Sequence, residues 1–207
     1  MQNNSNTFSP KIKICGLTNL DQTLACIEMG ADWIGFNCWK GSSRYIEPNQ
    51  ILKIINSLPK KITTVGVFVN ESVDSLEMIM KKTGMDLAQL HGDESHNYIE
   101  KIGVPWFKAF RVSPEFNKYQ IKNFGKELFL LDSYSKTNFG GTGKKLDWDK
   151  VSMYSKLGKL ILAGGLNPGN VFHAVKKVRP WGVDVCSGVE KKPGIKDITK
   201  VKNFIKQ

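Results

Sequence analysis

The stretch LILAGGLNPGNVFHAVKKVRPWGVDVCSGVE, residues 160–190, decides the fold of this 207-residue chain. It opens with an apolar run, LILA, and then turns at a pair of glycines. The apolar residues of its middle part recur at helical spacing and form one face: Val171, Ala174, Val175 and Val178. A second apolar run, GVDVC, follows and ends in another turn. This order predicts two parallel strands joined by a helical crossover.

The same unit recurs along the whole chain. Eight runs have the composition of short strands, and they span residues 11–15, 33–36, 63–69, 87–90, 106–110, 128–132, 160–165 and 182–186. Their starts lie about 20 to 32 residues apart, which is enough for one strand and the crossover that leads to the next parallel strand. Several runs are apolar throughout, as is typical of parallel strands covered by helices. Eight units in succession predict an α/β fold, a single-domain (β/α)8 barrel that spans residues 11–207. Residues 1–10 are predicted to form a polar tail before it.

The segments between the runs predict helices with recognisable ends. Asn19 is placed to cap the first helix, Pro48 to open the second and Gly84 to stop the third. Residues 198–205 predict a closing helix. The segment 113–126 contains a proline and a glycine, so it predicts a short helix at best.

Composition restricts the class of protein. The chain is 41% hydrophobic and 24% charged, which is typical of a globular domain. No apolar run approaches the roughly 18 residues of a membrane-spanning helix, and the first residues lack the pattern of a secretory signal. The cysteines are dispersed and form no CxxC pair, which favours reduced thiols in the cytoplasm over a disulfide framework or a zinc site.

The net charge of +11 is compatible with two interpretations. The 30 Lys and Arg residues are spread along the chain, often as KK pairs beside acidic residues. This spread favours a solvated basic surface over a nucleic-acid-binding patch. The positive field would also attract an anionic small-molecule substrate.

Barrels of this kind carry their active sites at the carboxyl ends of the strands. The candidate residues in those places are Cys15, Asn37, Arg44, His91, Arg111, Asp132, Gly164, Gly165, Asp184, Ser187 and Gly188. Gly164-Gly165 and Ser187-Gly188 each offer backbone N–H groups just before an expected helix. Either pair alone would indicate only a tight turn. Together, after the seventh and eighth strands, they predict a phosphate-binding site.

An ordered set of motifs spans the chain from residue 11 to the C-terminus. In order they are KICGLTN (residues 13–19), SSRYI (42–46), VGVFVN (65–70), QLHGDE (89–94), LLD (130–132), GGTGKKLDW (140–148), LAGGLNPGNV (162–171) and DVCSGVEKKPGIKD (184–197). With them the chain resembles the phosphoribosylanthranilate isomerases, TIM-barrel enzymes in the biosynthesis of the aromatic amino acid tryptophan. A single motif would mean little, but the ordered set is highly specific.

The resemblance implies an isomerase that carries out an Amadori rearrangement. N-(5-phosphoribosyl)anthranilate becomes 1-(2-carboxyphenylamino)-1-deoxyribulose 5-phosphate. In the family, the cysteine after the first strand is the general base and the aspartate after the sixth is the general acid, which correspond to Cys15 and Asp132. For work near neutrality, the pKa of the Cys15 thiol would have to be lowered. We expect the planar guanidinium of Arg44 to bind the anthranilate carboxylate.

The same chemistry sets the expected partners. Acid–base catalysis of this kind uses no metal and no redox cofactor. The expected partner is a small phosphorylated sugar-amine, with neither a nucleic acid nor a membrane, and the chain could be a monomer or a homodimer.

Alternatives stay open for individual residues. Without the motifs, Cys15 could be a small buried hydrophobic residue and Asp132 a loop-capping carboxylate. Asp184 could orient ribose hydroxyls or belong to a polar layer of the barrel. His91 is expected to have a structural or loop-orienting role and no part in proton transfer.

Departures from the family pattern affect the pocket. Cys38 stands where an aromatic residue is usual, and Lys40-Gly41 replaces the usual Pro-Lys, which leaves the shape of this loop open. Cys186 replaces the usual serine beside the phosphate-binding loops, so one hydroxyl contact would be lost while the backbone donors stay.

The residues at the strand ends fit three other functions less well. A ribulose-phosphate epimerase would need metal-binding His and Asp residues, and His91 has no such partners at the other expected strand ends. An indole-glycerol-phosphate synthase would need a catalytic lysine and a catalytic glutamate at strand ends, and Lys108 is the only lysine clearly in such a place. A basic nucleic-acid-binding or scaffold domain with a decayed barrel would have no reason to keep Cys15, Asp132 and both phosphate-binding loops.

Overall fold

Eight parallel strands close into a barrel in a computed structural model that describes residues 9–59, 61–133 and 146–207. The strands are β1 (Lys11–Cys15), β2 (Trp33–Asn37), β3 (Thr63–Phe68), β4 (Leu87–Leu90), β5 (Trp106–Val112), β6 (Leu128–Ser133), β7 (Lys159–Leu162) and β8 (Gly182–Val185). Each strand pairs with the next along the chain, and β8 pairs with β1. The predicted (β/α)8 barrel is therefore confirmed. Most of the predicted polar tail, residues 1–8, lies outside the described residues.

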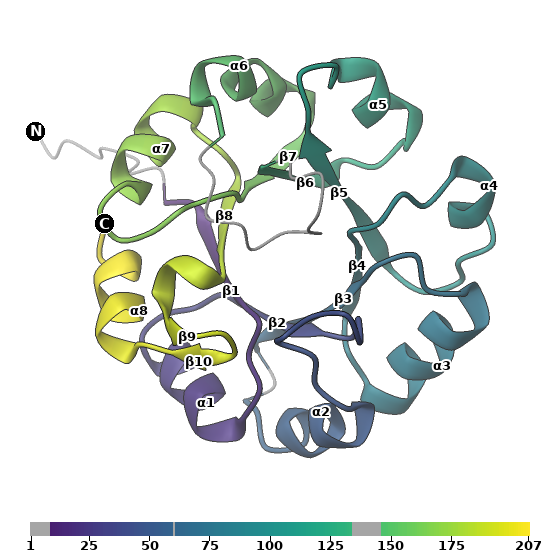
Figure 1. Ribbon diagram of the computed structural model, residues 1–207, viewed down its shortest axis with the longest axis vertical. Helices are drawn as coiled ribbons and strands as arrows, with labels where there is room; N and C mark the ends of the chain where they lie inside the picture. Colours follow the sequence, from purple (N-terminus) through teal and green to yellow (C-terminus); the bar gives the residue numbers. More distant parts are fainter. Residues whose placement is uncertain (1–8, 60, 134–145) are drawn as a thin grey trace, which may run out of the picture.

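Helices surround the barrel on the outside (Figure 1). They are α1 (Leu20–Glu28), α2 (Pro48–Ile55), α3 (Val73–Thr83), α4 (His96–Ile99), α5 (Lys118–Asn123), α6 (Trp148–Ser152), α7 (Val171–Val178) and α8 (Ile198–Ile205). The predicted ends are confirmed at three places. Asn19 Oδ1 accepts a hydrogen bond from the backbone N–H of Gln22, Pro48 opens α2, and Gly84 ends α3 in the left-handed conformation. The fifth crossover holds only a short helix, as expected.

The loops after β7 and β8 differ from the prediction. The predicted run 160–165 included the glycine pair that was expected to form its turn; β7 itself ends at Leu162, and Gly164 and Gly165 form the turn with φ values of +83° and +67°. After β8, Ser187–Val189 form a single 3₁₀ turn in place of an α-helix start. An antiparallel hairpin, β9 (Glu190–Lys192) and β10 (Ile195–Lys196), then precedes α8.

The interior of the barrel is filled with apolar side chains toward the amino ends of the strands. Buried residues of β3, β5, β6 and β7 form this cluster: Val65, Phe107, Ala109, Leu130 and Ile161, with Ala163 just after β7. Aromatic and leucine side chains at the starts of β2, β4, β6 and β8 pack against it: Trp33, Leu87, Leu128 and Trp181. The barrel is thus a packed core at this end, and space for a ligand lies at the carboxyl ends.

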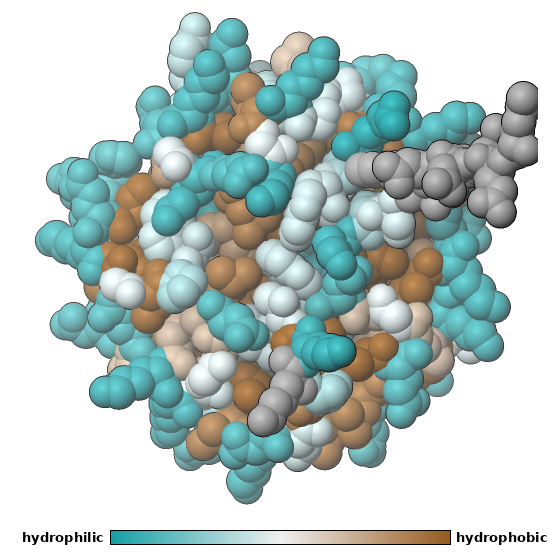
Figure 2. Space-filling model, turned by 180° about the vertical axis from the view of Figure 1, so that it is seen from behind, coloured by the Kyte–Doolittle hydropathy of each residue, from teal (hydrophilic) through white to brown (hydrophobic). Residues whose placement is uncertain are grey.

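Hydrophilic side chains project from much of the outline of the face seen from behind relative to Figure 1, and apolar residues lie among them (Figure 2). Within the part of the chain that the structure describes, no helix has the length and apolar character needed to cross a membrane.

Candidate active site

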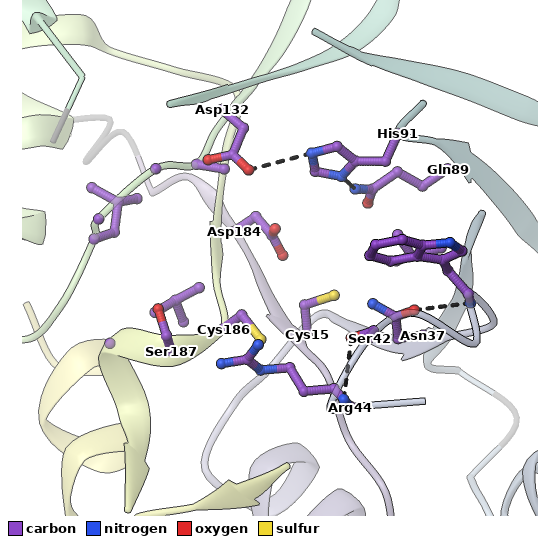
Figure 3. A pocket seen from close by; sticks show the side chains of 18 of the residues that line it. Cys15, Asn37, Ser42, Arg44, Gln89, His91, Asp132, Asp184, Cys186 and Ser187 are labelled. Carbon is purple, nitrogen blue, oxygen red and sulfur yellow. Dashed lines mark hydrogen bonds and ion pairs between the residues drawn. The ribbon is translucent and has the colours of Figure 1, made fainter. Parts of the chain in front are cut away.

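One cavity at the carboxyl ends of the strands brings all the predicted site residues together (Figure 3). They are Cys15, Arg44, Asp132, Gly164, Gly165, Asp184, Ser187 and Gly188. Asn37 and His91, two further candidates, line the same cavity. Arg111 does not, because it lines a separate recess beside β5. Ten of the eleven candidate residues at strand ends therefore line one cavity.

Cys15 lies at the end of β1 and is almost completely buried. Burial raises the pKa of its thiol, and the charges of Lys13 and Lys196 lower it, but burial is the larger effect. The lowered pKa that proton transfer near neutrality would require is therefore not found. Lys13, two residues earlier on the strand, forms a buried ion pair with Asp184, with 2.8 Å between Nζ and Oδ1. Asp184 both lines the cavity and belongs to a polar layer inside the barrel.

Asp132, at the end of β6, is held in place on both of its oxygen atoms. Its Oδ1 accepts a hydrogen bond of 2.7 Å from the backbone N–H of Ser133, and its Oδ2 lies 3.3 Å from Nε2 of His91. The other ring nitrogen of His91, Nδ1, lies 2.8 Å from the side-chain nitrogen of Gln89. His91 therefore lies between the side chain of Gln89 and the carboxylate of Asp132, a position that the expected structural or loop-orienting role did not specify (Figure 3).

The loops after β7 and β8 form one concave surface of backbone. They touch closely, since a Cβ atom at Gly188 would lie 1.9 Å from the carbonyl oxygen of Leu166. The backbone N–H groups of Gly165, Ser187 and Gly188 donate to no acceptor within the described residues. Buried or half-buried N–H groups without a partner are costly, so this surface is suited to an anion that accepts from them.

Arg44 is held from one side by a buried acidic residue that the sequence analysis did not single out. Glu190 accepts from Nε of Arg44 at 3.0 Å and from Nη2 at 2.7 Å. Lys196 donates to the same carboxylate at 3.0 Å. Burial alone would raise the pKa of Glu190, but the hydrogen bonds from Arg44 and the charge of Lys196 keep the pKa below its ordinary value.

This arrangement changes the expected role of Arg44 in one respect. The edge formed by Nε and Nη2 is occupied by Glu190, so a ligand carboxylate can meet only the edge formed by Nη1 and Nη2. Two cations and one anion meet here, Arg44, Lys196 and Glu190, and leave one excess positive charge beside the cavity. That charge favours the binding of a carboxylate.

Two of the departures from the family pattern have clear structural outcomes. Cys38 is buried and does not line the cavity, whereas the next residue, Trp39, does, so the loop after β2 still contributes an aromatic ring. Cys186 lines the cavity with its Sγ 3.7 Å from Oε1 of Glu190. Burial raises the pKa of Cys186 to about 12, so its thiol is neutral at physiological pH, as a serine hydroxyl would be.

Lys108 does not provide the catalytic lysine of an indole-glycerol-phosphate synthase in this cavity. Its ammonium points away, donating to Glu94 Oε2 at 2.9 Å and to the carbonyl oxygen of Gly92 at 2.8 Å. Within the residues described, no three His, Cys, Asp or Glu side chains are placed to hold a metal ion. The motif GGTGKKLDW cannot be placed as a whole, since residues 140–145 lie outside the described part of the chain.

Fold and cavity together define the class of protein, a (β/α)8-barrel enzyme with its active site at the carboxyl ends of the strands. Residues 12–207 match the family model described as N-(5'phosphoribosyl)anthranilate (PRA) isomerase. The N-(5'-phosphoribosyl)anthranilate isomerase of Geotalea uraniireducens (strain Rf4) is 43% identical over 197 residues, which cover 95% of this chain and 97% of that protein. The chain belongs to the N-(5'-phosphoribosyl)anthranilate isomerase family.

Solved structures agree with this assignment. The phosphoribosyl anthranilate isomerase of Thermotoga maritima superposes with a TM-score of 0.89 at 38% identity, covering 96% of this chain and 98% of that chain. A second structure has a TM-score of 0.86 at 38% identity and covers 96% of this chain and 97% of that chain. It is a phosphoribosyl anthranilate isomerase in complex with reduced 1-(o-carboxyphenylamino)-1-deoxyribulose 5-phosphate.

Proposed function

We propose that this chain converts N-(5-phosphoribosyl)anthranilate to 1-(2-carboxyphenylamino)-1-deoxyribulose 5-phosphate in tryptophan biosynthesis. The observation that carries the proposal is the single cavity, in which a thiol, a carboxylate and unpartnered backbone N–H groups face the same space. A related isomerase binds a reduced form of the same product, so the ligand chemistry matches this arrangement.

The reaction can be written with the groups of this cavity. Asp132 gives a proton to the ribose ring oxygen, the bond from that oxygen to C1′ breaks, and a Schiff base forms between C1′ and the anthranilate nitrogen. The Cys15 thiolate then removes the proton from C2′, and the electron pair moves to give an enolamine. Tautomerisation of the C2′ hydroxyl yields the ketone. An acid and a base on different strands, β6 and β1, suit a substrate held between them, and each contributes about 10²- to 10⁴-fold in rate.

The remaining proposals concern the partners and the extent of the catalytic unit. We take residues 11–207 as one catalytic domain acting in the cytoplasm on a small phosphorylated sugar-amine, without nucleic acid, membrane or cofactor. One Thermotoga maritima relative is described as dimeric, and this chain acts as a monomer or a homodimer.

The activity is tested by following the loss of phosphoribosylanthranilate fluorescence with the purified protein. Consumption of this substrate, with formation of the carboxyphenylamino product, supports the proposal. A well-folded protein that leaves the substrate unchanged would refute it.

The role of Arg44 leads to a prediction about selectivity. Arg44→Ala should weaken binding of the anthranilate-bearing product by very roughly 1.5 to 3 kcal/mol, because a charge-assisted contact to the carboxylate is lost. Binding of inorganic phosphate should be weakened less, since the donors predicted for the phosphate are backbone N–H groups and not the Arg44 side chain. Titration calorimetry with both ligands measures the difference. Arg111→Ala, which removes an arginine from the separate recess, is the matched control. Equal weakening of both ligands would place Arg44 in another role.

The phosphate-binding loops lead to a second prediction. Gly165→Val should raise the KM at least about tenfold, because Gly165 has a φ of +67° and a side chain there would also narrow the approach to the N–H groups. Gly188→Val should do the same by forcing the two loops apart. Ser187→Ala should cost much less, since most donors belong to the backbone. Gly169→Ala, in the same loop, is the control, because its Cβ would approach only Asn167 Oδ1, at 3.3 Å, and a small shift of that side chain relieves the contact.

A crystal soaked in phosphate provides the direct measurement for these loops. The anion should lie at the N–H groups of Gly165, Ser187 and Gly188. Duplex DNA serves as the comparison ligand in solution for non-specific binding to the basic surface. An empty site in a well-ordered, phosphate-saturated crystal would contradict the assignment.

A further inference from the structure

A lysine inside the barrel lies next to the proposed general base. Lys13 has only 2% of its surface exposed, among the lowest values of the large side chains in the described part of the chain. It stands two residues before Cys15 on β1, and side chains two apart on a strand point to the same face. Ile14, between them, and Ile12, before Lys13, face the other way, and Ile14 packs into the outer core. The alternation of β1 therefore places the ammonium and the thiol together inside the barrel.

The neighbouring strand β8 supplies the counter-ion. Lys13 and Asp184 are direct partners in the register of the two strands, and their side chains meet with 2.8 Å between Nζ and Oδ1. A buried ammonium is stable only when it is paired and hydrogen-bonded. Burial alone would lower the pKa of Lys13, but Asp184 and Cys15 together raise it, so Lys13 stays charged.

The strand on the other side, β2, leaves room for the contact. Gly35 pairs with Cys15 in the register of β1 and β2. A Cβ atom at Gly35 would lie 2.7 Å from Sγ of Cys15 and 3.2 Å from Nζ of Lys13. Both atoms therefore occupy the space that a side chain at position 35 would need. The thiol and the ammonium both border this space, and the positive charge of Lys13 lowers the pKa of Cys15.

We propose that Lys13 is a positioning residue that stabilises the thiolate of Cys15, while Asp184 holds its ammonium and Gly35 leaves space for both. When the Cys15 thiol loses its proton to solvent, the new negative charge forms beside a fixed positive one, and the proton that Cys15 later takes from C2′ returns the thiol to its neutral state. This proposal depends on the proposed function in one respect, namely that Cys15 is the general base.

Other groups face Cys15 from the elements around it. The charged and titratable ones are Asp184 on β8, Cys186 after β8, Lys196 on β10, Arg44 and Cys38 after β2, and Asp132 and His91 across the cavity. After burial, Lys13 has the largest effect on the pKa of Cys15, ahead of Asp184 and Lys196. Replacing Lys13 should therefore have a larger effect on the thiol than replacing any one of these neighbours.

The test is the pH dependence of Cys15 alkylation by iodoacetamide, which reacts with the thiolate. The modification is localised to Cys15 by peptide fragmentation, so the other cysteines do not interfere. In Lys13→Met, the midpoint should move to higher pH by about one unit or more, and Lys13→Arg should recover part of the shift. The sign follows from the charge, because a thiolate without its cation forms only at higher pH.

Two further variants separate this effect from a general loss of structure. Lys13→Met with Asp184→Asn removes both charges, so that no unpaired carboxylate stays buried, and it should still show a raised midpoint. Lys108→Met removes another buried lysine, one that pairs with Glu94 away from Cys15, and it should leave the midpoint unchanged. Circular dichroism confirms the fold of each variant.

The outcomes are decisive for the proposal. A Cys15 midpoint in the folded double variant equal to that of the wild type would overturn it, and so would an equal shift in Lys108→Met. The acidic limb of the kcat profile should move to higher pH together with the alkylation midpoint. Alkylation needs no substrate, so failure of the proposed function would appear separately, as undiminished turnover by Cys15→Ala.

Discussion

A Cys15→Ala variant is expected to lose at least about 100-fold in kcat while its fold stays intact. Among the described residues two thiols line the cavity, Cys15 and Cys186, and Cys15 lies on β1 beside the charged side chain of Lys13. Alanine offers no atom that could take the C2′ proton. The truncation removes one sulfur atom at the edge of an open cavity, so little packing is lost. Phosphoribosylanthranilate fluorescence measures turnover, and circular dichroism and the Tm measure the fold.

Cys26→Ala is the matched control for this experiment. Cys26 is completely buried in α1 and does not line the cavity, so its removal should lower the Tm slightly and leave kcat nearly unchanged. Binding of the product to Cys15→Ala should also stay close to that of the wild type, because the phosphate-binding loops and Arg44 are not altered. Near-normal turnover by a folded Cys15→Ala variant would remove Cys15 from the role of base.

Asp132→Asn should lose at least about 100-fold in kcat as well, and for a different reason. The amide keeps the shape of the carboxyl group, and its oxygen can still accept the hydrogen bond from the N–H of Ser133. It cannot release a proton to the ribose ring oxygen, so ring opening loses its acid. The expected signature is a fall in kcat with little change in product affinity.

Asp149→Asn is a suitable comparison for Asp132→Asn. Its side chain is 79% exposed in α6, and it makes the same chemical change without touching the cavity. Turnover by this variant should match the wild type. If Asp132→Asn were also to turn over at the normal rate, another group would have to protonate the ring oxygen.

The barrel could be predicted from the sequence because its signals are local. Buried parallel strands produce short apolar runs, and each crossover has a length that the chain must cover, so the recurrence of eight units was visible without any contacts. The hairpin of β9 and β10 was not predicted, because Glu190 and Lys196 hold it through buried charges and no apolar pattern marks it. The predicted run 160–165 extends three residues beyond the end of β7 because it included the glycine pair of the turn, whose left-handed conformation the structure shows.

The positions of the strand ends and the sequence motifs predicted the candidate site residues that line the cavity. Glu190 was missed because its partner Arg44 lies 146 residues away, and no local pattern records such a pairing. Lys13 was missed in the same way, although one signal was present. In KIKIC, Lys13 alternates with the two isoleucines and so shares a face with Cys15. The pKa of Cys15 could not be foreseen, because it depends on burial.

The pairing of β1 with β8 has a consequence for folding kinetics. Lys13 meets Asp184 across 171 residues of chain, and Arg44 meets Glu190 across 146, so the groups around Cys15 come from the two extremes of the sequence. Contacts of such separation form late, because the entropy of closing the long loop must be overcome before they stabilise the chain. A refolding chain that has seven strands in place still lacks Asp184 and half of the anion site. The rate at which turnover returns after dilution from denaturant therefore reports how fast β1 pairs with β8.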